Sequence, residues 1–166
     1  MADLTIALAG NPNAGKTTIF NLLTGLHQHT GNWPGKTVEK KEGEVQHRNL
    51  KINVVDLPGT YSLTAYSPEE IIARDFIIQE HPDVVINVVD ATNLERNLYL
   101  TVQILELDVP VVIALNMTDD LHKNGAKINL DQLSQLLGDI PVVSTTANQG
   151  KGVSDLLTKA VRAARK

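Results

Sequence analysis

The sequence contains no cysteine, no long hydrophobic run and no excess of positive charge. Without cysteine, a disulfide framework and a thiolate metal site are both excluded, which suits a reducing cytosol. The longest apolar runs, residues 84–89 and 109–115, are much shorter than the roughly 20 residues that cross a bilayer, so no membrane span is predicted. Lysine and arginine number 15 against 19 acidic residues, a net charge of -4. A general nucleic-acid or membrane-surface binder carries a basic excess instead.

The chain length and the pattern of apolar runs predict one α/β domain over residues 1–166. The N-terminus MADLTIALAG lacks the basic region and long apolar segment of a signal peptide, so a first strand is expected there. Runs rich in valine, isoleucine and leucine, typical of buried strands, occur at residues 4–9, 52–55, 84–89, 111–115 and 141–144. Helical patterns alternate with these runs. This alternation predicts a three-layer fold with a mostly parallel sheet of six to seven strands and helices on both faces.

The helical segments have recognisable ends and apolar stripes. A capping box from Ser67 to Glu70, with proline at the first helical position, predicts a helix start. A second helix is expected from about residue 93, with its apolar stripe on Leu94, Leu98, Val102 and Leu105. Further helices are expected at residues 130–137 and 153–164. Residues 25–38 fit neither the helical nor the strand period, so a functional loop is predicted there.

A phosphate-binding loop is predicted between the first strand and the first helix. Residues 10–17, GNPNAGKT, match the pattern G-x-x-x-x-G-K-[ST] in the required strand-to-helix context. The backbone N–H groups of such a loop point at the phosphates, Lys16 reaches the β and γ oxygens, and Thr17 ligates Mg²⁺. The strand and helix on either side disfavour an ordinary glycine-rich turn. The predicted phosphate-binding residues are Asn13, Ala14, Gly15, Lys16, Thr17 and Thr18.

A second motif, Asp56-Leu-Pro-Gly59, follows a predicted strand. Asp56 would hold Mg²⁺ through water, and the backbone N–H of Gly59 would contact the γ-phosphate only while that phosphate is present. Taken alone, D-x-x-G is also typical of an ordinary strand-to-loop turn. The phosphate loop upstream favours the interpretation as a switch segment that senses the γ-phosphate. Many switch GTPases have a glutamine directly after this glycine, where this chain has Thr60. Another group must therefore assist the attacking water.

A third motif, Asn116-Met-Thr-Asp119, is similar to the guanine-binding N-K-x-D pattern. N-x-x-D also occurs at residues 53–56 and 87–90, but those begin inside apolar strands. A carboxylate at Asp119 can accept from the ring N–H and the amino group of guanine, which predicts selectivity for GTP over ATP; otherwise it is a solvated loop acid. Met117 would give the base apolar cover. Thr146, Ala147 and Asn148 would support the base through their backbone.

In order along residues 3–160, the segments GNPNAGKT, GNWPGKTVEKKEG, DLPGTYSL, NVVDATNLERNLYL and NMTD resemble the N-terminal G domain of the ferrous-iron transport protein FeoB, a TrmE-Era-type GTPase. The resemblance implies a Ras-like P-loop GTPase fold and slow, Mg²⁺-dependent hydrolysis of GTP to GDP and phosphate. In that family this switch domain regulates iron(II) uptake and precedes a helical domain and a polytopic membrane region. This chain would then be a soluble piece at the cytoplasmic face of the cell membrane. Its partners would be GTP, GDP and those domains, without nucleic acid, and self-association stays open.

The same resemblance implies a replacement for the missing glutamine. Thr37 would be the second hydroxyl ligand of Mg²⁺, and K⁺ would bind Asn13 and the backbone carbonyls near Gly31 and Trp33. A monovalent cation there would offset charge as the bond to the γ-phosphate breaks. The expected catalytic set is Asn13, Lys16, Thr37 and Gly59. From residue type alone, Asn13 is also a typical turn residue and Trp33 a loop anchor.

Two other functional classes remain open from the sequence. A ribosome- or RNA-associated GTPase of the Era kind would need an RNA-binding domain or a basic face, and the sequence has neither. A nucleotide-binding module that signals occupancy without useful turnover is the other. The histidines are scattered without zinc-like spacing, so none is assigned to a metal.

Overall fold

The computed structural model describes residues 1–64 and 66–165, which form a seven-stranded sheet with the order β2-β3-β4-β1-β5-β6-β7. Strands β4, β1, β5, β6 and β7 are parallel, and β2 and β3 are added antiparallel at one edge. The predicted mostly parallel α/β fold is confirmed. The strands are β1 Leu4–Gly10, β2 Gln28–Asn32, β3 Glu39–His47, β4 Leu50–Asp56, β5 Val84–Asp90, β6 Val111–Asn116 and β7 Val142–Ser144.

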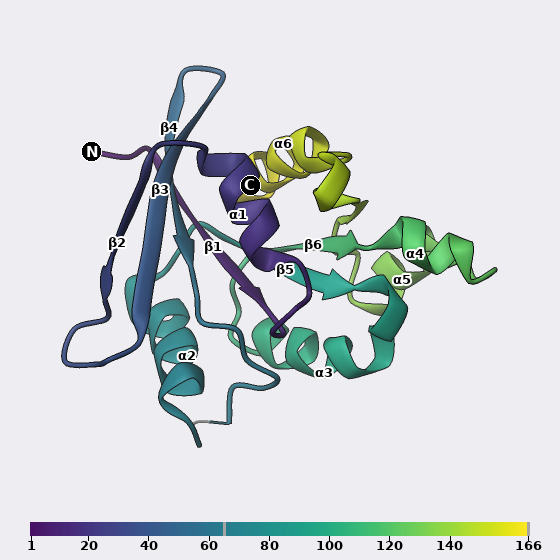
Figure 1. Ribbon diagram of the computed structural model, residues 1–166, viewed down its shortest axis with the longest axis horizontal. Coiled ribbons are helices and arrows are strands. Elements are labelled where there is room, and N and C mark those ends of the chain that lie inside the picture. Colours follow the sequence, from purple (N-terminus) through teal and green to yellow (C-terminus); the bar gives the residue numbers. More distant parts are fainter. Residues whose placement is uncertain (65, 166) are drawn as a thin grey trace.

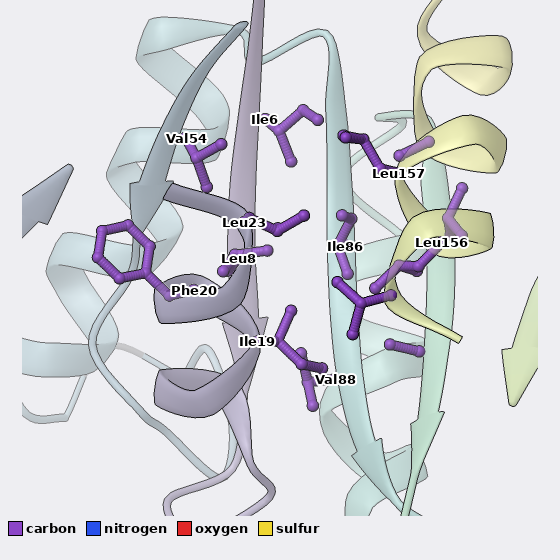
Figure 2. Close-up of a cluster of buried hydrophobic side chains, with 14 of the residues drawn as sticks. Ile6, Leu8, Ile19, Phe20, Leu23, Val54, Ile86, Val88, Leu156 and Leu157 are labelled. Atoms are coloured by element: carbon purple, nitrogen blue, oxygen red, sulfur yellow. The ribbon is translucent and has the colours of Figure 1, made fainter. Parts of the chain in front are cut away.

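Helices cover both faces of the sheet, as Figure 1 shows. One face carries α1 (Lys16–Thr24) and α6 (Val153–Ala164), whose apolar side chains meet those of β1, β4 and β5 in the core drawn in Figure 2. The other face carries α2 (Pro68–Glu80), α3 (Leu94–Leu105) and α4 (Thr118–Lys123). The remaining elements are α5 Leu130–Leu136 and the 3₁₀ turns η1 Ala91–Asn93 and η2 Ala147–Gln149. Within the described residues, none of the helices combines the length and apolarity that crossing a membrane requires.

The prediction of a loop over residues 25–38 is wrong at its centre, where β2 forms and pairs with β3. Both strands are polar: β2 is the edge strand, β3 lies between β2 and β4, and Gly43 is the buried position of β3. A Cβ atom at Gly43 would lie 2.6 Å from the carbonyl oxygen of His27, so a larger residue does not fit. Without an apolar run or clean alternation, such strands give little sequence signal.

The predicted apolar stripe of α3 is wrong in part: Leu94 and Leu105 are partly buried against the core, but Val102 is not. Val102 is 48% exposed, whereas the buried residues of this helix are Asn97, Leu100, Thr101 and Ile104. The two polar members are buried because each has a hydrogen-bond partner on β5. Asn97 Oδ1 accepts from the N–H of Asp90 (3.1 Å), and Thr101 Oγ1 donates to Asn87 Oδ1 (2.5 Å). Polar residues therefore occupy core positions that a hydrophobic pattern cannot reveal.

Candidate nucleotide site

The three predicted motifs meet at one edge of the sheet. The phosphate loop follows β1, the Asp56–Gly59 segment follows β4, and the Asn116–Asp119 segment follows β6. The parallel register pairs Leu8 with Asp56 and Asp90 with Asn116, which aligns these strand ends. Ligands of open parallel sheets bind outside the carboxyl ends of the strands. The topology therefore brings together segments that lie far apart in the sequence.

The phosphate loop curls around an open cavity at the start of α1. Gly15 has a φ of 98°, and a Cβ atom there would lie 2.1 Å from Nδ2 of Asn116, so both backbone and space require glycine. Asn13 also has a left-handed backbone, with φ 71°, which asparagine tolerates better than most residues. The cavity has a volume of about 470 Å³. Its lining residues are Asn11, Pro12, Asn13, Gly15, Lys16, Thr17, Thr18, Gly59 and Met117.

Lys16, which lines this cavity, forms a buried ion pair with Asp56. Burial raises the pKa of the Asp56 carboxyl above its ordinary value, while the charge and hydrogen bond of the Lys16 ammonium act in the opposite direction. The lysine thus compensates a carboxylate that would be costly to bury alone. Thr17 is exposed in the first turn of α1 and lines the same cavity.

The segment after β4 packs directly on the phosphate loop. The N–H of Thr60 donates to the carbonyl oxygen of Gly10 (3.1 Å), and a Cβ atom at Gly59 would lie 3.3 Å from Pro12. Thr60 is only 5% exposed. The residue at the position of the missing glutamine is therefore packed into the protein, whereas Gly59 lines the cavity.

Asn116 connects the phosphate loop to the loop after β7. Its Nδ2 donates to the carbonyl oxygen of Ala14 (3.0 Å), and its Oδ1 accepts from the N–H of Ala147 and from Thr145 Oγ1, both at 3.0 Å. The next residue, Met117, has a left-handed backbone (φ 63°) and lines the cavity. These contacts place two segments predicted to contact the base beside the segment predicted to bind phosphate.

The remaining residues predicted to contact the base differ in exposure. Asp119 is half-buried in the first turn of α4, Thr146 and Ala147 are buried, and Asn148 is exposed. In the competing N-x-x-D matches the asparagines lie inside strands: Asn53 in β4 and Asn87 in β5, where Asn87 is buried and donates to the carbonyl oxygen of Ala9 (3.3 Å).

The structure does not bring the residues predicted to complete the Mg²⁺ and K⁺ sites, Gly31, Trp33 and Thr37, to this cavity. Gly31 and Thr37 are exposed in and after β2, and neither lines the cavity. Trp33 is buried against α2, where its ring lies edge-on to Phe76 with centroids 5.7 Å apart. Lys40 lies over the same indole, 4.8 Å from its centroid. The loop-anchor interpretation of Trp33 describes this arrangement.

Sequence reasoning assigned Glu70 to a helix cap but missed its wider role. The N–H of Glu70 donates to Ser67 Oγ (3.2 Å), as a capping box requires. Its carboxylate accepts from the hydroxyls of Ser62 and Thr64, both at 2.7 Å, and from the N–H of Thr64. These hydrogen bonds, from Thr64 first and Ser62 second, lower the pKa of Glu70. Glu70 therefore ties the segment after Gly59 to the start of α2.

The fold and this cavity define the class of the protein: a P-loop GTPase-type G domain. The profile of the family described as ferrous iron transport protein B matches residues 4–160. The Fe(2+) transporter FeoB of Escherichia coli K12 is 51% identical over 160 residues, covering 94% of this chain and 21% of that protein. An Fe(2+) transport protein A/FeoB fusion protein of Porphyromonas gingivalis is 53% identical over 154 residues, covering 92% of this chain and 18% of that protein.

Solved structures agree with these sequence matches. The FeoB G-domain from Methanococcus jannaschii superposes with a TM-score of 0.89 at 48% identity, and each chain is covered completely. An S. thermophilus NFeoB N11A mutant bound to mGDP superposes with a TM-score of 0.91 at 53% identity, covering 96% of this chain and 60% of that one. The chain belongs to the ferrous iron transport protein B family. It spans about a fifth of the length of the curated relatives it matches.

Proposed function

We propose that this domain binds GTP and hydrolyses it to GDP and phosphate, and that the cycle regulates iron(II) uptake by a longer membrane protein. The observation that carries the proposal is the Asn116 side chain, which joins the phosphate loop to the segments predicted to contact the base around one cavity. The backbone of residues 13–18 and the Lys16 ammonium would bind the phosphates. Asp119, Met117 and residues 146–148 would hold guanine. GDP in relatives' structures supports this assignment.

The residues around Lys16 suit Mg²⁺. The Thr17 hydroxyl and the Asp56 carboxylate are the oxygen ligands that this ion prefers; Asp56 pairs with Lys16, and Thr17 lines the same cavity as Lys16. Bound there, the ion would neutralise charge on the β- and γ-phosphate oxygens. Lys16 would then leave Asp56 for the phosphates, and the N–H of Gly59 would contact the γ-phosphate. Thr37 would join the site only after the chain between β2 and β3 moves.

The potassium part of the proposal also requires that movement. Asn13 lines the cavity and offers a neutral amide oxygen, whereas Gly31 and Trp33 lie outside it. K⁺ would supply positive charge beside the phosphates, in place of the missing glutamine and of an arginine finger. In the longer relatives this domain would face the cytoplasm beside its helical and membrane regions. The family matches give no support for an RNA-associated function.

The test is phosphate release from GTP in potassium against sodium at equal ionic strength. We expect potassium to raise the rate about tenfold or more, by offsetting charge in the transition state. Asn13→Gly is the sharper variant, because it removes the amide without straining the left-handed backbone, while Asn13→Ala adds that strain. Both should lose the potassium gain. Equal rates in potassium and in sodium would exclude this role of Asn13. No phosphate release in either salt would mean that the domain is a nucleotide-binding module without turnover.

A further inference from the structure

The chain between β4 and α2 passes alongside α3 (Figure 1), and two side chains of that helix hold it. The guanidinium of Arg96 lies over the ring of Tyr61, 4.4 Å from its centroid. The side-chain oxygen of Gln103 accepts a hydrogen bond from the backbone N–H of Leu63. Arg96 and Gln103 are about two helical turns apart and so lie on one face of α3. We call this pair the α3 clamp.

The α3 clamp acts on the residues that follow Gly59. Thr60 is fixed to the phosphate loop through the carbonyl oxygen of Gly10, and the clamp fixes the next residues, Tyr61 and Leu63. Leu63 is 9% exposed, so loss of the glutamine oxygen would leave its N–H without a hydrogen-bond partner and would destabilise this segment. Gly59 therefore stands at the end of a segment held from two sides, by the phosphate loop and by α3.

Arg96 also lies next to the nucleotide cavity. With Tyr61 it lines a polar cavity of about 180 Å³ behind the phosphate loop, together with residues 11–14. Asn11 is 4% exposed, and its Oδ1, which has no hydrogen-bond partner, belongs to a residue lining this space. Lys16 and Arg96 are the cationic residues among those lining the two cavities. The stacked Tyr61 and Arg96 side chains thus line a cavity that also borders the phosphate loop.

We propose that Arg96, assisted by Gln103, is a positioning residue for GTP hydrolysis: the α3 clamp holds the backbone after Gly59 so that the Gly59 N–H is presented to the γ-phosphate. This rests on the proposed function. Arg96 acts through Tyr61 and does not touch the nucleotide. Catalysis of phosphoryl transfer depends mainly on positioning and fixed charge, so a looser Gly59 slows the reaction more than it weakens nucleotide binding.

The kinetic test uses Arg96→Met, which keeps an apolar stem and removes the charge. We expect kcat to fall about threefold to tenfold with KM changed less than about twofold, the scale of one lost cation–π contact. Tyr61→Leu should match it, while Tyr61→Phe, which keeps the ring, should retain most of the wild-type kcat. The double variant Arg96→Met/Tyr61→Leu should be no slower than either single one. Tyr99→Leu, on an exposed residue of the same helix, is the matched control.

A second readout needs no turnover. Hydrogen exchange of the Leu63 amide, measured without nucleotide, should be faster in Gln103→Met and in Arg96→Met than in the wild type and in Tyr99→Leu. Unchanged exchange in both variants, or single effects on kcat that multiply in the double variant, would overturn the clamp. If the wild type releases no phosphate from GTP, the proposed function fails, and the exchange measurement alone decides whether α3 holds this segment.

Discussion

Replacing Asn116 by alanine should destabilise the domain far more than removal of an ordinary polar side chain. The change removes three hydrogen bonds and leaves the Ala14 carbonyl and the Ala147 N–H without their partner. Asn116 is 3% exposed, so these groups are poorly placed to bind water. Each unpaired buried group costs about 1–3 kcal/mol, which gives a loss of about 2–6 kcal/mol for the two. At about 2–4 °C per kcal/mol for a chain of this size, Tm should fall by about 4–24 °C.

Thermal and urea unfolding without nucleotide measure this loss apart from any effect on binding. Asn124→Ala, at an exposed asparagine, is the control and should stay within about 0.5 kcal/mol of the wild type. Asn116→Asp keeps the acceptor for Ala147 but buries a carboxylate and turns an acceptor oxygen toward the Ala14 carbonyl, so it should be at least as destabilising as Asn116→Ala. A Tm for Asn116→Ala within about 2 °C of the wild type would refute the view that Asn116 joins the two loops.

Three further perturbations follow from single contacts. Gly15→Ala should cost about 2 kcal/mol or more in urea unfolding, through left-handed strain and a clash. It should cost clearly more than Gly150→Ala, whose backbone is also left-handed (φ 71°) but where the space is open. Hydrogen bonds lower the pKa of Glu70, so the stability that they contribute is present above the ordinary pKa of 4.5 and is lost as pH falls through the lowered pKa. Hydrogen exchange of residues 62–64 should become faster over that fall in pH. Glu70→Gln, which does not titrate, should remove this dependence of exchange on pH. The fluorescence emission of Trp33, the single tryptophan, should change when a non-hydrolysable GTP analogue and Mg²⁺ are added in potassium. If potassium stimulates hydrolysis but the emission spectrum does not change, the proposed movement of the chain between β2 and β3 is contradicted.

The central strands and the ends of the motif loops could be predicted because they depend on local chemistry. Buried parallel strands are continuous apolar runs, and the phosphate loop needs glycine at a position such as Gly15. The edge strand β2 and its neighbour β3 could not be predicted, because their polar side chains carry no period. The buried face of α3 was misassigned since Asn97 and Thr101 are buried through hydrogen bonds to β5.

Within the site, the sequence predicted residues near the phosphates but not the contacts that hold them. The Lys16–Asp56 pair, the bridge made by Asn116 and the stacking of Arg96 on Tyr61 join residues distant in the sequence. Only the topology of the sheet and of α3 brings them together. The place of Trp33 against α2 likewise depends on a tertiary contact, with Phe76, which no local pattern contains.

The most direct test of the central claim is phosphate release from GTP and from ATP by the purified domain, with Mg²⁺ and K⁺, beside Lys16→Ala. The account predicts turnover of GTP with a kcat/KM at least about 100-fold above that for ATP, because a carboxylate such as Asp119 leaves adenine without its hydrogen bonds. It also predicts that Lys16→Ala loses the activity. Equal turnover of the two nucleotides, or GTP turnover that survives the loss of Lys16, would contradict it.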